Sequence, residues 1–133
     1  MEAELVTYAL LSGAGAVTAV VGTRIFPVML PLRQPTPAIV YSLVDGVRVS
    51  TIDAQAATHL MRSRVQVDLI SKDYVVTLTL RAAVLAAMQF KRGAIGGVTV
   101  HSVLHQPEGH VSYDQNLDLF TRPLDFLITH EST

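Results

Sequence analysis

The chain has 133 residues, a length that suits one domain, residues 1–133, built around a single hydrophobic core. It contains no cysteine, which excludes disulfides, thiolate nucleophiles and metal sites with sulfur ligands. Ten Lys and Arg against eleven Asp and Glu give a net charge of −1, so we expect no sequence-specific nucleic acid partner. Because 50% of the residues are hydrophobic and only 16% are charged, we expect self-association to cover apolar surface.

The first predicted element is a helix over residues 5–21, a segment without any charged residue. Leu5, Tyr8 and Ser12 begin a series with spacings of three and four residues, which is typical of a helix that packs on one side. Gly22-Thr23 is expected to end this helix.

Two other interpretations of this helix are excluded by its composition. A membrane segment is not expected, because serine and glycines interrupt a run that is already short for a bilayer. A dinucleotide site is not expected either, because no strand precedes Gly13-Ala14-Gly15 and Thr18 stands in place of the third glycine.

The next segment, residues 24–37, holds four of the six prolines and is predicted to cross the surface without regular structure. Residues 38–44 are mainly apolar and β-branched, which predicts a strand. Asp45-Gly46 is a favoured turn sequence and predicts a hairpin into residues 47–49. Residues 51–58 are small and polar, which predicts a loop or a hairpin tip.

A clean alternation predicts a half-buried strand over residues 61–69, with Val65 and Val67 on one side and Arg64 and Gln66 on the other. A second helix is expected to follow, with Ser71 as its cap and Asp73 in its first turn. Four of its residues lie along one face before Gly93 ends it: Leu78, Ala82, Leu85 and Gln89.

After Gly96-Gly97, the sequence predicts a strand over Val98–His105, a turn at residues 107–109, a short return over 110–113 and a long strand over 117–130. Pro123 lies inside the long strand, which indicates an edge position or a bulge, because proline has no backbone N–H to donate. The order of the elements predicts an α+β domain with a single mainly antiparallel sheet and two helices packed on one face.

No pattern indicates a metal site or an active site. His101 and His105 are about 13 Å apart if they share a strand, which is too far for one ion. The sequence has no Gly-x-Ser-x-Gly motif, and Asp114 and Asp118 are interpreted as turn residues. Arg122 and Asp125 are close in sequence and suggest a structural or intersubunit ion pair. We therefore predict no enzyme, no cofactor and no metal.

Short segments in a fixed order carry a family resemblance: Arg24-Ile25-Phe26-Pro27, Pro37-Ala38-Ile39-Val40-Tyr41, Arg64-Val65-Gln66-Val67-Asp68, Asp73-Tyr74, and Arg122-Pro123-Leu124-Asp125-Phe126-Leu127-Ile128. In order and spacing, over nearly the whole chain, the sequence resembles the tail-completion or tail-terminator-like proteins of tailed bacteriophages and prophages.

The resemblance implies a small structural α+β protein of the virion neck, assembled in the cytoplasm of the bacterial host. It implies a ring, with six subunits, that caps the tail tube, contacts the head–tail connector and lets DNA pass. The family offers no catalytic residues to carry over, and the matching positions are expected to be structural or interfacial: Arg24, Phe26, Pro27, Tyr41, Arg122, Asp125 and Phe126. The whole chain shows no charge bias for lining a DNA passage, which leaves Arg48, Arg62 and Arg64 as local candidates.

Two alternatives stay open at this point. One is a small-molecule-binding or enzymatic domain, which would be indicated by a pocket between sheet and helices with convergent polar side chains. The other is a head-completion or tail-tube protein; a loop over residues 47–58 that orders only on stacking would indicate a tube subunit.

Overall fold

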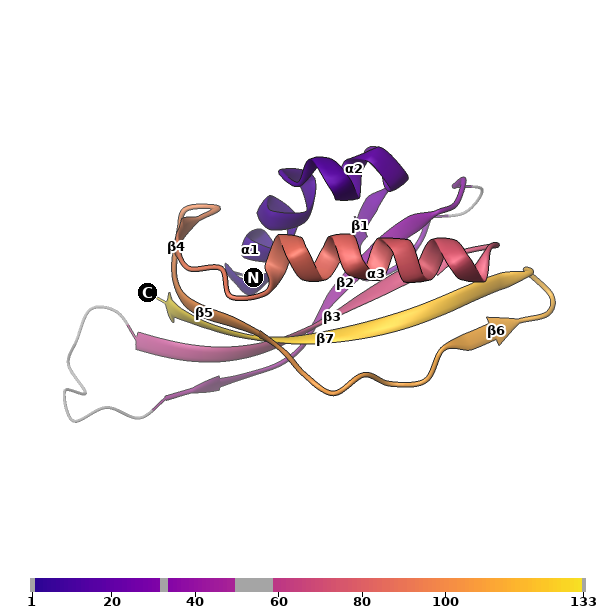
Figure 1. Ribbon diagram of the computed structural model, residues 1–133. Helices are drawn as coiled ribbons and strands as arrows, with labels where there is room; N and C mark the ends of the chain where they lie inside the picture. Colours follow the sequence, from indigo (N-terminus) through magenta and orange to yellow (C-terminus); the bar gives the residue numbers. More distant parts are fainter. Residues whose placement is uncertain (1, 32–33, 50–58, 133) are drawn as a thin grey trace.

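The structure, a computed structural model, describes residues 2–31, 34–49 and 59–132. Within these ranges it has three helices and a seven-stranded, mostly antiparallel sheet (Figure 1), so the predicted α+β class is confirmed. The helices are α1 (Glu2–Ser12), α2 (Gly15–Val21) and α3 (Tyr74–Met88). The strands are β1 (Ile25–Pro27), β2 (Ala38–Arg48), β3 (His59–Ser71), β4 (Gly93–Ile95), β5 (Val98–His105), β6 (Ser112–Asp114) and β7 (Leu119–Ser132).

The sheet has the order β1-β2-β3-β7-β5-β4, and β6 pairs with β7 beside this path. β1 runs parallel to β2, and the other neighbours are antiparallel. The long pair of β3 and β7 forms the middle of the sheet, with a register from His59↔Ser132 to Ser71↔Phe120. All three helices lie on the same side of the sheet (Figure 1). We call the other side the open face.

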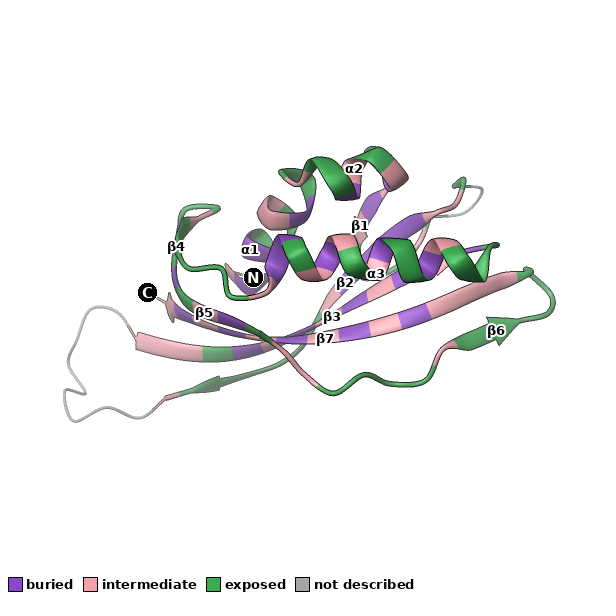
Figure 2. Cartoon of the chain, viewed as in Figure 1, coloured by how far each residue is buried: buried purple, intermediate pink, exposed green. Residues whose placement is uncertain are grey.

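The predicted alternation of β3 is confirmed and explains the position of the core. Val65, Val67 and Leu69 are fully buried, and β7 places Leu124 and Phe126 beside them on the helix side. Successive side chains point to opposite faces of a strand, so the residues between them reach the open face and are only partly buried (Figure 2). The helices therefore pack on one face of the two central strands, β3 and β7.

The single helix predicted over residues 5–21 is wrong, because the chain breaks into α1 and α2 with a bend of 84°. Ser12 Oγ donates to the Tyr8 carbonyl, and Ala14 has extended backbone angles, so the helical ladder stops at Gly13. The predicted face is also wrong. Leu5 and Tyr8 are about half exposed, because an apolar segment without charges gives the periodicity no clear polar side. The predicted end after Val21 agrees with α2.

The sequence also failed at the first two strands. β1 lies within the segment that was predicted to be irregular, and it pairs with residues 39–41 of β2. β2 does not turn at Asp45-Gly46; it continues to Arg48, and the register shift between Leu43 and Asp45 marks a bulge. Pairing with β3 overrides the local turn preference. The predicted loop over residues 51–58 lies outside the described residues.

The second predicted helix exists as α3, but it ends at Met88 and not at Gly93, and it has a different cap and a different buried face. Asp73 is the N-cap, since its side chain accepts the N–H of Val75, and Ser71 in turn accepts the N–H of Asp73. Leu80 and Val84 are fully buried with Thr77 and Met88, and Ala87 is mostly buried, whereas the predicted stripe from Leu78 to Gln89 is half-buried or exposed. Apolar residues occur all around this helix, so several stripes fit the same spacing.

Pro123 lies in β7, a central strand, in regular register with β3, and not at the sheet edge or the bulge that were predicted. Its opposite partner on β3 is Asp68. Gln106 N–H donates to the Asp125 carbonyl, so the backbone groups of Asp125, and of Pro123 two residues before it, face the β5 side. There the strand pairs with β6 only up to Thr121 and with β5 only from Phe126 onward. The missing N–H therefore falls in a gap between two partners.

Candidate functional site

The outer strand β2 presents an edge that the rest of the described chain leaves unpaired. β1 covers only residues 39–41, because Pro27 ends the strand and Val28, with φ 69°, turns the chain away. Among the described residues, no strand pairs with residues 42–48 on the side away from β3. Leu43, Val44 and Val47 in this segment are 39, 51 and 62% exposed. We call residues 42–48 the open edge; unpaired strand edges with apolar side chains are templates for pairing with another chain.

The opposite edge of the sheet, at β5, is protected against pairing with another strand. β4 pairs with the first residues of β5, and the end of α3 covers the rest. Gln89 Oε1 accepts the N–H of His105 at 2.6 Å, and Phe90 N–H donates to the Val103 carbonyl at 2.9 Å. These bonds occupy backbone groups of β5 that a further strand would need. The two edges of the sheet are therefore different surfaces: the edge at β2 is open and the edge at β5 is capped.

Four of the residues predicted from the sequence meet at the corner between α2, β1 and β2. Arg24 donates from Nε to the Pro37 carbonyl at 2.9 Å and from Nη2 to the Val20 carbonyl at 3.4 Å. Phe26 and Pro27 pair with Val40 and Tyr41 across the parallel ladder. These residues hold β1 against β2, and so define where the open edge begins.

The Tyr41 side chain extends this corner to α1. Its ring centroid lies 6.2 Å from that of Tyr8, and the residue is only 7% exposed. Burial raises the pKa of the Tyr41 hydroxyl, and the nearby Glu4 and Tyr8 raise it further. The hydroxyl is therefore neutral at physiological pH.

The other three predicted residues lie on both faces of β7 and do not form one site. Arg122 is buried on the helix side, with its guanidinium 5.4 Å from the Tyr74 ring centre and Nε donating to Thr77 Oγ1 at 3.4 Å. Phe126 is a fully buried core residue. Asp125 points to the open face, so Arg122 and Asp125 do not pair within the chain. An intersubunit pair stays a prediction.

The open face carries the charged side chains that the predicted alternation of β3 placed opposite the core, together with Asp125 of β7. Asp68 lies diagonally across the β3–β7 ladder from Asp125. Burial raises the pKa of Asp68 and so does the charge of Asp125, while a hydrogen bond of 2.8 Å from Gln66 opposes both. Arg62 and Arg64 share this face, and Arg48 lies on the other one, opposite Met61. The three arginines proposed for a lumen therefore do not line one surface.

Replacing Asp68 with asparagine is expected to raise the melting temperature slightly at pH 7. A carboxyl with a raised pKa in the folded state weakens folding above that pKa, and the penalty disappears as the pH falls and the group is protonated. The difference between Asp68→Asn and wild type should therefore shrink toward pH 4. Thermal denaturation across this pH range measures it, with Asp45→Asn on the exposed part of β2 as the control.

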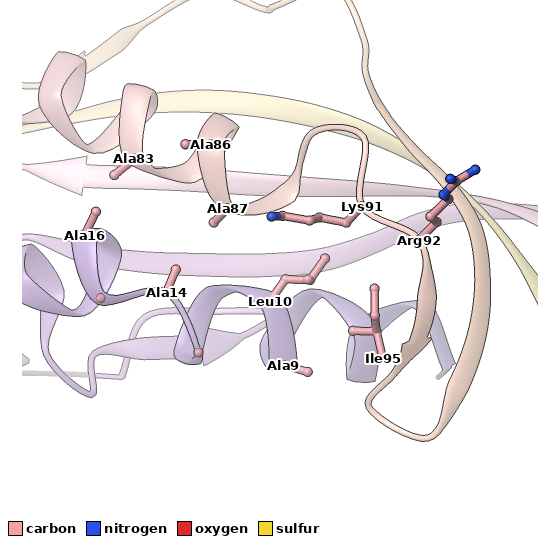
Figure 3. Close-up of a pocket in the computed structure, with 12 residues that line it drawn as sticks. Ala9, Leu10, Ala14, Ala16, Ala83, Ala86, Ala87, Lys91, Arg92 and Ile95 are labelled. Atoms are coloured by element: carbon pink, nitrogen blue, oxygen red, sulfur yellow. The ribbon is translucent and has the colours of Figure 1, made fainter.

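A groove of about 480 Å³ lies between α1, the start of α2, the second half of α3 and β4 (Figure 3). Its walls are mainly alanine and glycine, because small side chains face each other where α1 bends and where α3 ends. Lys91 and Arg92 carry the only charged or polar side chains among the lining residues. The groove does not gather convergent polar groups of the kind that a small-molecule site requires.

Among the described residues, no group of three or more His, Asp or Glu side chains is arranged to hold a metal ion. No single described helix has the length and hydropathy to cross a membrane. α1 and α2 reach that length and hydropathy only when they are taken together, across their bend of 84°.

Sequence reasoning missed two exposed apolar groups. Tyr74, Val75 and Leu78 lie on the outer side of α3, and Phe90 after the helix is 73% exposed with φ 62°. The high hydrophobic content of the chain was the signal that surface of this kind exists. Its location depends on which side of α3 meets the sheet, which the periodicity did not decide.

The chain matches a family model and solved structures. Residues 7–131 match the family model described as "Tail completion protein gp17". Among solved structures, a chain of the "Virion of native gene transfer agent (GTA) particle" superposes with a TM-score of 0.66 at 16% sequence identity. The superposition covers 96% of this chain and 92% of that chain, and at this identity it shows a common fold. No curated protein matches the sequence.

Proposed function

The chain belongs to the tail completion protein gp17 family, and from this premise we propose that it is the subunit of a ring that closes the tail tube. Family membership makes it a structural component of a phage-like virion tail. In the proposal the ring has six subunits, lies at the head-proximal end of the tube and caps its polymerisation. Its other side contacts the head connector, DNA passes through it, and assembly takes place in the host cytoplasm.

The observation that carries the proposal is the open edge of β2. A closed ring needs two different surfaces on each subunit, which meet head to tail. The sheet has an open edge at β2 and a capped edge at β5. Two copies can therefore meet through two different edges and do not have to use the same patch. The exposed Val44 and Val47 on the open edge supply apolar area for such a contact.

The mass of the purified protein tests the proposal, measured by light scattering coupled to size exclusion across a concentration series at moderate salt. A closed hexamer supports it. A stable dimer contradicts it, because a two-fold interface uses up the surfaces that a ring requires. If the protein is a monomer, tail-tube protein is added. A ring that forms on the tube supports the proposal, and a monomer that does not bind the tail-tube protein contradicts it.

A further inference from the structure

The connection between β6 and β7 forms an acidic turn with an apolar tip, which we define as residues 114–118. Asp114 Oδ1 accepts the N–H groups of Asn116 at 2.9 Å and Leu117 at 3.3 Å, and Tyr113 Oη donates to Asp118 Oδ1 at 2.6 Å. These bonds fix the turn, so Leu117 stays at its tip with 62% of its surface exposed. The turn thus presents one leucine between two carboxylates.

The groove between the helices has the complementary character. Its walls are small and apolar, and its charged lining side chains, Lys91 and Arg92, are both positive. Figure 3 shows the Lys91 side chain pointing into the groove toward Ala87, while Arg92 points away at its end. Among the described residues, no carboxylate forms an ion pair with either cation. An acidic segment with an apolar tip matches this surface in charge and polarity.

The turn and the groove cannot meet within one chain, because they lie at opposite ends of α3. The aromatic contacts of Phe120 with Tyr113 and with Tyr74 hold the turn beside the first residue of α3. The groove is lined by Ala83, Ala86 and Ala87 near the end of the helix. A helix of 15 residues is about 22 Å long, and Figure 1 shows β6 and β4 at its two ends.

We propose that the acidic turn of one copy docks in the groove of the next copy, with Leu117 against the alanines, one aspartate facing Lys91 inside the groove and the other facing Arg92 at its end. This contact joins two different surfaces, so it is head to tail and repeats from copy to copy. The proposal rests on the proposed ring and names one contact that closes it. Opposite charges on the two surfaces also fix the register of the contact.

Engineered cysteines test the contact directly, because the chain has no cysteine of its own. The variant Leu117→Cys with Ala86→Cys places one thiol on the turn and one in the groove, both on exposed residues. Under mild oxidation we expect a ladder of disulfide-linked chains that ends at the size of the ring. The control pairs Leu117→Cys with Thr99→Cys, an exposed residue of β5 that does not line the groove, and should give no ladder.

Charge reversal is the second test. Lys91→Glu with Arg92→Glu should raise the dissociation constant of the assembly at least about tenfold, because four acidic groups then face each other. The turn variant Asp114→Asn, Gln115→Lys, Asp118→Asn keeps acceptors for the turn and should weaken wild-type assembly as well. Combining both sets should restore assembly to within about threefold of wild type, and circular dichroism verifies that each variant is folded.

The outcomes separate this contact from the ring itself. If wild type forms rings, but the cysteine variant gives no ladder and the charge variants assemble as wild type does, the proposed contact is wrong and the proposed ring is retained. If the cysteines link open chains while wild type forms no ring, even with tail-tube protein, the contact stands and the ring is wrong. If no association and no ladder appear, both are overturned. A groove that binds only an acidic segment of another virion protein also overturns the contact.

Discussion

Replacing Phe126 with alanine is expected to lower the free energy of unfolding by about 3–5 kcal/mol. The Phe126 side chain is fully buried in the centre of β7, opposite Val65 and in contact with the His105 ring at a centroid distance of 5.5 Å. Removing it leaves a cavity between the sheet and the helices. The loss is a large part of the roughly 5–15 kcal/mol that stabilises a typical domain. Urea denaturation measures it as a lower midpoint with an unchanged slope.

Leu127→Ala is the matched control, because the next residue of the same strand points to the open face and is only partly buried. Leu127→Ala should lower the free energy of unfolding clearly less than Phe126→Ala does, when both are measured on the monomeric form. Equal losses would contradict the assignment of the core to the helix side.

Lysine at both Val44 and Val47 is expected to leave the subunit folded and to prevent ring formation. Both side chains are more than half exposed on the open edge, so lysine costs little in the monomer. In a ring that uses this edge, two charges would be buried without partners on each subunit, and lysine on an edge strand is a known protection against pairing. Light scattering should show a shift from ring to monomer with an unchanged melting temperature of the monomer.

The control for this pair is Val75→Lys, the same substitution at an equally exposed residue on the first turn of α3. It should leave the ring intact. Rings that persist in the Val44→Lys, Val47→Lys variant would show that the open edge is not an interface.

The central strands were predictable because their alternation has a single physical cause. β3 and β7 each bury one face under the helices, so Val65 and Val67 alternate with polar residues, and β5 agreed with its predicted bounds. The helices were harder, since nearly every residue of α1 and α3 is small or apolar and several faces fit the same spacing. The break at Gly13 needed the packing of α2 to decide it.

The candidate surfaces were less predictable than the fold. Arg24 and Tyr41 were singled out from the sequence, and the structure places both at the corner between α2, β1 and β2. The open edge and the groove depend on which segments lack a neighbour, and single-sequence patterns do not contain that information. The bulge in β2 shows this most clearly, because pairing with β3 carries the strand through Asp45-Gly46.

The position of β7 has a consequence for the timing of synthesis. β7 is the last strand along the sequence, yet it lies between β3 and β5 in the middle of the sheet. On a ribosome that adds about 5–20 residues per second, the edges of β3 and β5 that pair with β7 stay unpaired until β7 emerges. Pairing of this long range also closes slowly. A subunit of the proposed ring therefore completes its sheet only after β7 has been synthesised.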